Sequence, residues 1–304
     1  MKYNFNLIIM LVLLSLQANS QEVFPLWSDS QIPNYKQSNE QEFIPERNII
    51  FIQKVQKPTL EVFLPSKQNA NGMAVLILPG GGYSGVAYDW EGTDYAKWFN
   101  SIGIAAFVLK YRMPQSASVI TSYKAPIQDA QRAIRYVRAH AGKFNIDKDK
   151  VGVIGSSAGG HLASTLAIHD TNYYDFKDDI DKEKIKPDFQ MLIYPVVSMK
   201  REVTHMGSRN NLLGKTPEEV LIQQYSNELN VKENTPVTFI IHSGNDKVVP
   251  IENSLRLYKA LLSKNVNTTM HIFPEGGHGY SLGLTKKSTP DWTSLAKEWL
   301  IQFD

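Results

Sequence analysis

The sequence of 304 residues contains no cysteine. This absence excludes disulfide bonds, a thiol nucleophile and cysteine-based zinc sites, so burial of a hydrophobic core must hold the fold together. A chain of this length can bury a core of sufficient size. The histidines are scattered along the chain and do not occur at ligand spacing, and we therefore expect neither a metal nor a cofactor.

An excess of charge of either sign is also missing. The chain carries 32 Lys and Arg against 30 Asp and Glu, which gives a formal net charge of +2. A nearly neutral chain offers no argument for binding to nucleic acid or to an anionic membrane surface.

Long hydrophobic runs are absent as well, and the apolar run over residues 7–14 is too short to span a bilayer. A basic start, this short run, and the small residues Ala18 and Ser20 are typical of a signal peptide. We therefore expect residues 1–20 to be cleaved and the mature protein to be secreted or periplasmic, without stable insertion in a membrane.

The remaining chain shows alternating strand and helix patterns. Residues 21–47 read as a polar N-terminal extension, and two short apolar runs, 49–52 and 60–64, look like a pair of antiparallel strands. From there to the C-terminus the alternation predicts a mostly parallel sheet covered by helices on both faces, and no linker divides residues 48–304. The expected strands are 74–78, 105–110, 151–154, 190–194, 237–242 and 270–273, and the expected helices are 95–102, 127–144, one from 158, 253–263 and 292–303.

A Gly-x-Ser-x-Gly motif directly follows the predicted strand 151–154. Its central residue is Ser157, and its glycines are Gly155 and Gly159. A serine on a sharp turn between a strand and a helix needs small neighbours, because larger side chains would collide with the adjoining elements. The turn raises the hydroxyl of Ser157 above the sheet edge, as a nucleophile requires.

A second signal is a run of glycines after the predicted strand 74–78. Gly81 and Gly82 lie where backbone N–H groups can approach a substrate closely. Together with the N–H of Ala158, the residue after the serine, they are the candidate donors of an oxyanion hole. The choice between Gly81 and Gly82 stays open.

Two further residues follow the serine in the order acid and then histidine. Asp246 comes after the predicted strand 237–242, and His278 comes after 270–273. In this order and position they complete a catalytic triad, in which His278 accepts the proton of Ser157 and Asp246 orients His278.

These motifs resemble the esterase branch of the α/β-hydrolase family that is related to hormone-sensitive lipase, and within it bacterial acetylxylan-esterase-like and carbohydrate-esterase proteins. The resemblance implies an α/β-hydrolase fold with a mostly parallel eight-stranded sheet and a serine esterase activity. One departure is Pro79, because lipase-like relatives carry histidine before the glycines. The resemblance rests on residues 79–83, 107–112, 129–133, 155–161 and 208–214 and on the loops of Asp246 and His278.

Other polar residues in these motifs have structural interpretations. Asp129 and Arg132 are expected to pack or to form salt bridges, and His161 is expected to be structural. His205 lies in the insertion 199–235, where a surface loop is favoured over a small lid.

The substrate is less well defined by the sequence. The insertion is largely polar, which favours a short acyl group such as acetyl, and Tyr83 and Trp90 are candidates to contact a sugar, with packing under the loop as the alternative. We therefore expect a secreted serine esterase that acts on an acylated carbohydrate of the xylan type or on another small ester. A serine peptidase, a general short-chain carboxylesterase and a non-catalytic relative remain alternatives.

Overall fold

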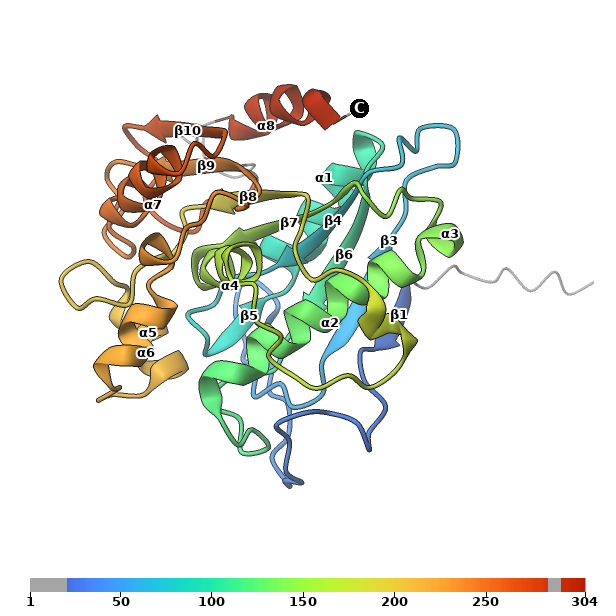
Figure 1. The fold of residues 1–304 in the computed structure, drawn as a ribbon, viewed down its shortest axis with the longest axis vertical. Helices are drawn as coiled ribbons and strands as arrows, with labels where there is room; N and C mark the ends of the chain where they lie inside the picture. The colour runs from blue at the N-terminus through green and yellow to red at the C-terminus, as the bar shows by residue number, and fades with distance from the viewer. Residues whose placement is uncertain (1–20, 284–290, 304) are drawn as a thin grey trace, which may run out of the picture.

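The computed structural model describes residues 21–283 and 291–303, so the predicted signal peptide lies outside the described residues. Its centre is an eight-stranded sheet in which six neighbouring strands, from β6 to β10, run parallel (Figure 1). Two antiparallel pairings, β1 with β3 and β3 with β6, complete one edge. The prediction of a mostly parallel eight-stranded sheet is thus confirmed. In spatial order the strands are β1 (Glu22–Pro25), β3 (Thr59–Phe63), β6 (Ala105–Lys110), β4 (Ala74–Leu78), β7 (Val151–Ser156), β8 (Phe189–Ile193), β9 (Val237–Ser243) and β10 (Thr268–Phe273).

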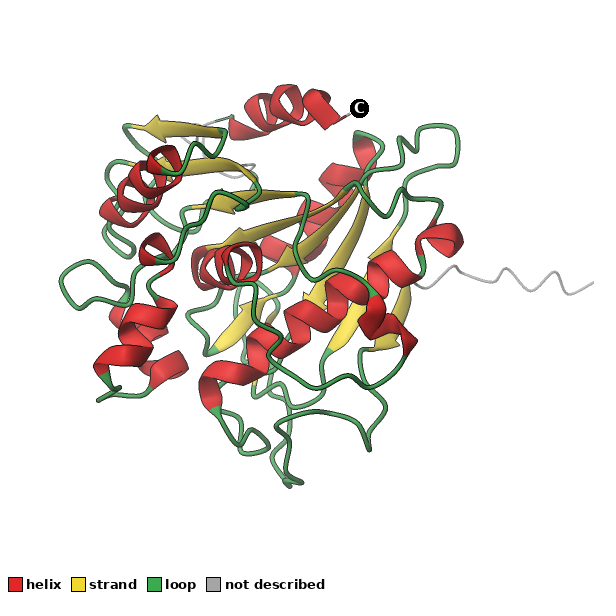
Figure 2. Ribbon diagram, in the orientation of Figure 1, coloured by secondary structure: helices red, strands yellow, loops and turns green. Residues whose placement is uncertain are grey.

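Helices cover both faces of this sheet (Figure 2). Among residues 21–283 and 291–303, no helix has the length and apolar character needed to cross a membrane. The helices are α1 (Asp94–Ser101), α2 (Ala125–Ala139), α3 (Ala141–Phe144), α4 (Ser157–Ile168), α5 (Met206–Leu213), α6 (Glu219–Tyr225), α7 (Glu252–Ser263) and α8 (Trp292–Leu300), with short turns η1 (Asp89–Thr93), η2 (Ser122–Lys124), η3 (Asp179–Lys182), η4 (Asn227–Leu229) and η5 (Ile301–Phe303).

The side chains of β4 show how the sheet separates two cores. Leu76 and Leu78 pack with α2, α4 and α7 in one core, whereas Val75 and Ile77 pack with α1 and α8 in the other. Successive side chains of a strand point to opposite faces, so a strand buried on both faces reads as a continuous apolar run. This is why the central strands were readily predicted from sequence.

The predicted pairing of residues 49–52 with 60–64 is wrong. The first run forms β2 (Phe51–Gln53), which pairs antiparallel with β5 (Gly85–Ala87) in a separate two-stranded sheet. The second run, β3, pairs with β1 and β6 instead. Nearness in sequence suggested the pair, but β2 is only three residues long and its partner follows the glycine loop. This arrangement places Phe51 beside that loop.

The segment before residue 48 contributes to the main sheet, since β1 is its edge strand. Trp27, which follows β1, is 4% exposed, and its indole N–H donates to Asp129 on α2 over 3.0 Å. Asp129 also binds Arg112 in a fully buried ion pair, and Arg132 pairs with Asp178. The structural roles expected for Asp129 and Arg132 are confirmed.

The long helix expected over residues 127–144 is divided in two. α2 ends at Ala139, and His140, with φ of −107° and ψ of 20°, separates it from the single turn of α3. Gly142 lies inside that turn, and glycine is a poor helix former, which fits a break at this point.

Candidate active site

Ser157 lies at the sharp turn between β7 and α4. Its φ of +53° is in the left-handed region, which costs energy for a residue other than glycine, and the residue is only 7% exposed. The neighbouring glycines are required by contact: a Cβ at Gly155 would overlap the carbonyl oxygen of Gly159, and a Cβ at Gly159 would overlap that of Leu78. The structure therefore gives the steric reason for the motif found in the sequence.

Gly159→Ala is expected to destabilise the protein strongly. The added methyl group would meet the backbone of Leu78, which belongs to β4 and cannot rotate away. Overpacking of this kind costs on the order of 3 kcal/mol of unfolding free energy. The matched control is Gly142→Ala, because a Cβ there meets nothing within 4 Å. Urea denaturation measures both variants, and equal stability of the two would contradict the steric account.

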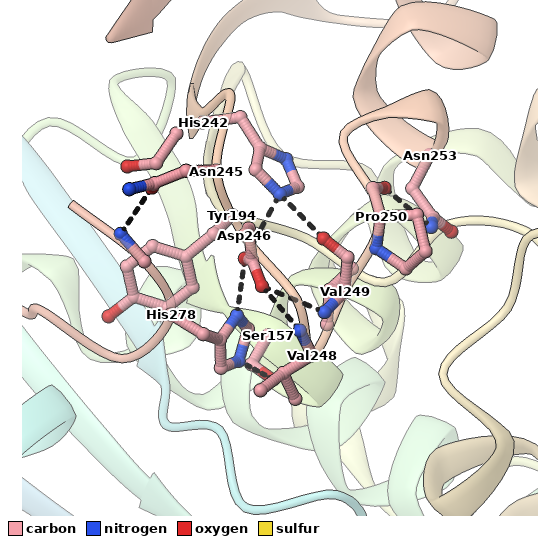
Figure 3. A network of polar contacts seen from close by, with 12 residues as sticks. Ser157, Tyr194, His242, Asn245, Asp246, Val248, Val249, Pro250, Asn253 and His278 are labelled. Atoms are coloured by element: carbon pink, nitrogen blue, oxygen red, sulfur yellow. Dashed lines mark hydrogen bonds and ion pairs between the residues drawn. The ribbon is translucent and has the colours of Figure 1, made fainter. Parts of the chain in front are cut away.

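The structure brings Ser157, His278 and Asp246 together from three separate elements. The Nε2 atom of His278 lies 2.9 Å from the Ser157 hydroxyl oxygen, and its Nδ1 atom lies 2.7 Å from Oδ2 of Asp246 (Figure 3). Asp246 follows β9, His278 follows β10, and Ser157 begins α4. With Nδ1–H donating to Asp246, the other ring nitrogen of His278 is an acceptor for the serine proton.

Asp246 is held by four hydrogen bonds in this arrangement. Its Oδ1 atom accepts the backbone N–H groups of Val248 and Val249 at 2.8 and 2.9 Å. Its Oδ2 atom accepts from His242 at 3.2 Å as well as from His278. Burial alone would raise the Asp246 pKa, but the bonds from His242 and His278, the charge of His278 and the N–H of Val249 outweigh it and hold the pKa well below its usual range. The acid therefore stays ionised when the imidazole becomes protonated.

The carbonyl groups of the glycine loop after β4 are engaged in hydrogen bonds within the protein. The carbonyl oxygen of Gly81 accepts from Ser84, and that of Gly82 accepts from the side-chain amide of Asn211 at 2.8 Å. Both glycines have positive φ, 140° and 64°. Their N–H groups, with that of Ala158 at the start of α4, remain the candidate oxyanion donors, and the choice between Gly81 and Gly82 stays open.

Around Ser157 lies an open cavity of about 470 Å³. Its apolar wall contains Ile49, Phe51, Trp90 and Val248, and its polar groups come from both the glycine loop and α5. This volume admits a small acyl group together with part of a larger alcohol. The other lining residues include Arg47, Gly81, Gly82, Ser84, Ala87, Glu91, His205, Gly207, Asn211, His278 and Gly279.

Of the two predicted sugar contacts, the structure places one at the cavity. Trp90 lines it, and its indole N–H donates to the carbonyl oxygen of Gly279 at 2.9 Å. Tyr83 is 1% exposed and its hydroxyl lies 2.8 Å from Nδ1 of His161. Tyr83 thus packs beneath the loop, where a substrate does not reach it. The prediction that Tyr83 contacts a sugar is wrong, and the alternative of packing under the loop is correct.

His161 has the structural role expected from the sequence. It is 1% exposed, and it links Tyr83 of the glycine loop to the carbonyl oxygen of Tyr225, which lies 2.8 Å from Nε2. Burial lowers the pKa of His161 to about 4, and burial also lowers the pKa of the nearby His169 to about 4.

This pair predicts a loss of stability in mild acid. Below about pH 6.5 a histidine is protonated in the unfolded chain, whereas His161 and His169 stay neutral in the folded protein until about pH 4. The unfolded state then binds more protons, so the unfolding free energy falls as the pH drops between these values, by about 1.4 kcal/mol per pH unit for each histidine. Urea denaturation from pH 7.5 to 4.5 measures this slope. His161→Gln should reduce the slope by the contribution of one histidine, about 1.4 kcal/mol per pH unit. An unchanged slope in His161→Gln would contradict the account.

The insertion 199–235 forms part of the site. The prediction that His205 lies in a surface loop is therefore wrong. His205 lines the cavity and caps α5, where its side chain accepts the backbone N–H of Ser208. Burial and then the positive charge of His278 lower its pKa. Asn211, on the same helix, binds the glycine loop, so α5 is a polar wall of the cavity.

Two cavity residues were missed by reasoning from sequence. Asn211 lies within the family motif 208–214, but its contact with Gly82 spans 129 positions of sequence. Glu91 lies in the single turn η1 and is 4% exposed. Neither carries a local signal of burial. In the part of the chain that the structure describes, no group of three or more His, Cys, Asp or Glu side chains could hold a metal ion.

Several known proteins are similar to this chain. A family model described as BD-FAE matches residues 60–261. The acetylxylan esterase of Xylanibacter ruminicola is 35% identical over 231 residues, which cover 75% of this chain and 44% of that protein. Endo-1,4-beta-xylanase B of Butyrivibrio fibrisolvens is 38% identical over 208 residues, 68% of this chain and 32% of that protein. This chain thus spans less than half the length of these two relatives.

Among solved structures, the acetyl ester-xyloside bifunctional hydrolase of Caldicellulosiruptor lactoaceticus matches with a TM-score of 0.78 and 35% identity. The match covers 93% of this chain and 96% of that one. An α/β hydrolase from a deep-sea metagenome, MGS-M1, matches with a TM-score of 0.61 and 30% identity, over 84% and 97% of the two chains. The α/β-hydrolase fold expected from the sequence is therefore confirmed.

Proposed function

Because this chain belongs to the BD-FAE family, we propose that it is a serine carboxylic-ester hydrolase that removes short acyl groups, acetyl in particular, from carbohydrates. The observation that carries the proposal is the continuous hydrogen-bonded chain from Ser157 through His278 to Asp246. Similarity to proteins named for acetyl esters and for xylan supports the acyl group and the class of alcohol.

In the proposed reaction, the Ser157 oxygen attacks the ester carbonyl carbon while His278 Nε2 takes the hydroxyl proton. The oxyanion of the tetrahedral intermediate accepts hydrogen bonds from the glycine loop and from Ala158. His278 then gives its proton to the leaving alcohol, and the acyl group stays on Ser157 until water, activated by the same imidazole, removes it.

The cavity favours a short acyl group on a polar alcohol. Its insertion-derived wall consists of polar positions, His205 and Asn211 with Gly207 between them, rather than an apolar lid. Trp90, which is partly exposed, offers an aromatic side chain on which a sugar ring can stack.

Release of acetate from acetylated xylo-oligosaccharides is the experiment that tests this proposal. We expect hydrolysis of these oligosaccharides and of 4-nitrophenyl acetate, a lower rate with 4-nitrophenyl butyrate, and no cleavage of an aminoacyl 4-nitroanilide. Faster cleavage of the anilide would favour a peptidase. Hydrolysis of the nitrophenyl esters without acetate release from sugars would favour a general carboxylesterase, and no hydrolysis at all would refute catalysis.

We also propose export, on the basis of the short apolar run and the small residues that follow it. Mass spectrometry of protein recovered outside the cytoplasm should find a mature chain that starts near Gln21. Recovery there of a chain that still carries Met1 would refute cleavage.

A further inference from the structure

A second carboxyl group lies buried beside the nucleophile, apart from the triad. Glu91 belongs to η1, borders the cavity and is 4% exposed. Its Oε2 atom accepts the backbone N–H of Gly80 at 2.8 Å, and its Oε1 atom accepts the hydroxyl of Tyr194 at 2.7 Å. Both oxygens of one buried carboxyl are thus engaged by groups from two different strand ends.

The hydrogen bond between Glu91 and Gly80 holds a backbone segment that contacts Ser157. A Cβ placed on Gly80 would lie 3.0 Å from the Cβ of Ser157, so the two chain segments are in direct contact. Gly80 immediately precedes the two glycines that offer the candidate oxyanion donors. Since its own N–H is bound to Glu91, Gly80 is not one of these donors, and the bond instead fixes the point from which the donors extend.

The hydrogen bond between Glu91 and Tyr194 connects Glu91 to the loop that carries His278. The Tyr194 hydroxyl accepts the backbone N–H of Ser281 at 3.0 Å, three residues after His278. The ring of Tyr194, which is completely buried, meets the His278 ring edge to face with centroids 4.9 Å apart. Figure 3 shows Tyr194 beside His278. One carboxyl group therefore supports both the loop of the oxyanion donors and the loop of the base.

The hydrogen bonds also indicate the charge of this group. Both oxygens of Glu91 act as acceptors, as suits an ionised carboxylate, whereas a protonated one would need an acceptor for its own proton. Burial raises the pKa of Glu91, and the bond from Tyr194, the positive charge of His278 and the bond from Gly80 reduce this rise without cancelling it, so the pKa stays above its usual value. In the part of the chain described here, Glu91 forms no salt bridge with Lys or Arg, so its charge is available to the imidazolium.

We infer that Glu91 is a positioning residue of the hydrolytic reaction, which fixes the oxyanion loop through Gly80 and the His278 loop through Tyr194. Its negative charge also stabilises the protonated His278 that forms when Ser157 attacks. The inference rests on the proposed function, because it assigns Glu91 a part in that reaction.

In the part of the chain that the structure describes, charged or titratable side chains face His278 or border its cavity from several elements, and one of them is Arg47, which precedes β2. Asp246 after β9 binds it directly, Tyr194 after β8 packs against its ring, and His205 before α5 and Glu91 in η1 border the same cavity. Removal of the Glu91 charge disfavours the protonated imidazole. The acid limb of the profile of kcat/KM against pH should then move to lower pH.

The two roles of Glu91, positioning of the loops and stabilisation of protonated His278, can be distinguished with three variants: Glu91→Gln, Glu91→Asp and Tyr194→Phe. The substrate is 4-nitrophenyl acetate. For Glu91→Gln we expect kcat to fall by about tenfold to a hundredfold, which is a smaller decrease than removal of one oxyanion-hole donor causes. KM should change little, and the acid limb of the pH profile should move to lower pH. Glu91→Asp keeps the charge but is too short to reach both partners, so kcat should fall while the acid limb stays in place. Tyr194→Phe should behave like Glu91→Asp, because it keeps the carboxylate and removes the hydroxyl that donates to Glu91 and accepts from Ser281.

The matched controls are Glu61→Gln and Tyr88→Phe. The Tyr88 hydroxyl donates to Glu61 at 2.6 Å, which is the same kind of bond outside the cavity. These variants should keep wild-type kcat and pH profile.

The inference is overturned if Glu91→Gln keeps wild-type kcat, or if its kcat falls only as far as that of Glu61→Gln without movement of the acid limb. Should Glu91→Gln not fold, Tyr194→Phe decides, and wild-type kcat in that variant overturns the inference. A wild-type protein that hydrolyses no ester would instead refute the proposed function, which distinguishes the two failures.

Discussion

Ser157→Ala is expected to lower the turnover of 4-nitrophenyl acetate by about four to six orders of magnitude, the loss typical of a triad serine. The structure gives the reason in geometry: the hydroxyl at 2.9 Å from His278 is the group from which the imidazole can take a proton. The fold should survive, because the change removes one oxygen atom from a turn and adds nothing. Thermal unfolding of the variant should therefore match that of the wild type.

The control for this variant is Ser164→Ala on the same helix. Ser164 is fully buried, and its hydroxyl donates to the carbonyl oxygen of His161, away from the cavity. We expect Ser164→Ala to keep its turnover within a few-fold of wild type. A Ser157→Ala protein that retained activity within tenfold of wild type would refute the assignment of the nucleophile.

Asp246→Asn is expected to cost about four decades in turnover while leaving the protein folded. The amide preserves the shape of the site, but it cannot stabilise the imidazolium, and its NH₂ group can favour the wrong tautomer of His278. In the wild type, activity should rise with pH as His278 loses its proton, since only the neutral imidazole can act as a base. Measurement of kcat/KM as a function of pH, for the wild type and for Asp246→Asn, tests both expectations.

Neighbouring polar groups provide the controls for Asp246. Glu252, the first residue of α7, pairs with Arg256 on the protein surface, so Glu252→Gln should cost little. The side-chain oxygen of Asn245 accepts the backbone N–H of Gly277 at 2.8 Å, next to His278. Asn245→Ala should therefore lower turnover more than Glu252→Gln and less than Asp246→Asn. A crippled Glu252→Gln beside a nearly silent Asp246→Asn would show that the acid is misassigned.

The central sheet and the triad could be predicted from sequence because their signals are local. A strand buried on both faces, such as β4, reads as a continuous apolar run. The glycines at 155 and 159 mark a turn in which no side chain fits, and the contacts of each with backbone explain why. Asp246 and His278 were found through their order and through their position after strands.

The pairing of the short strands could not be predicted in the same way. β1 and β2 are four and three residues long, and β1 is largely exposed, so neither has a pattern that selects its partner. The partner of β2 was misplaced because nearness along the chain was the one guide available. Its pairing with β5 depends on the path of the glycine loop, which only the folded structure provides.

The residues that support the site depend on long-range contacts. Glu91 meets Gly80 and Tyr194 at separations of 11 and 103 positions, and no motif surrounds it. His205 was read as a surface residue because its segment is polar, yet its place as the N-cap of α5 brings it to the cavity. Tyr83 was read as a sugar contact because it follows the glycines, but its φ of +58° accompanies a side chain that is buried against His161.

Labelling with diethyl 4-nitrophenyl phosphate tests the central claim most directly, because a serine activated by this triad should attack the phosphorus atom and release 4-nitrophenolate. We expect peptide mass spectrometry to locate one diethylphosphoryl group per chain on Ser157, and acetate release from acetylated xylo-oligosaccharides to fall in proportion to the label. A label on another residue, or full acetate release from the completely labelled protein, would contradict the account.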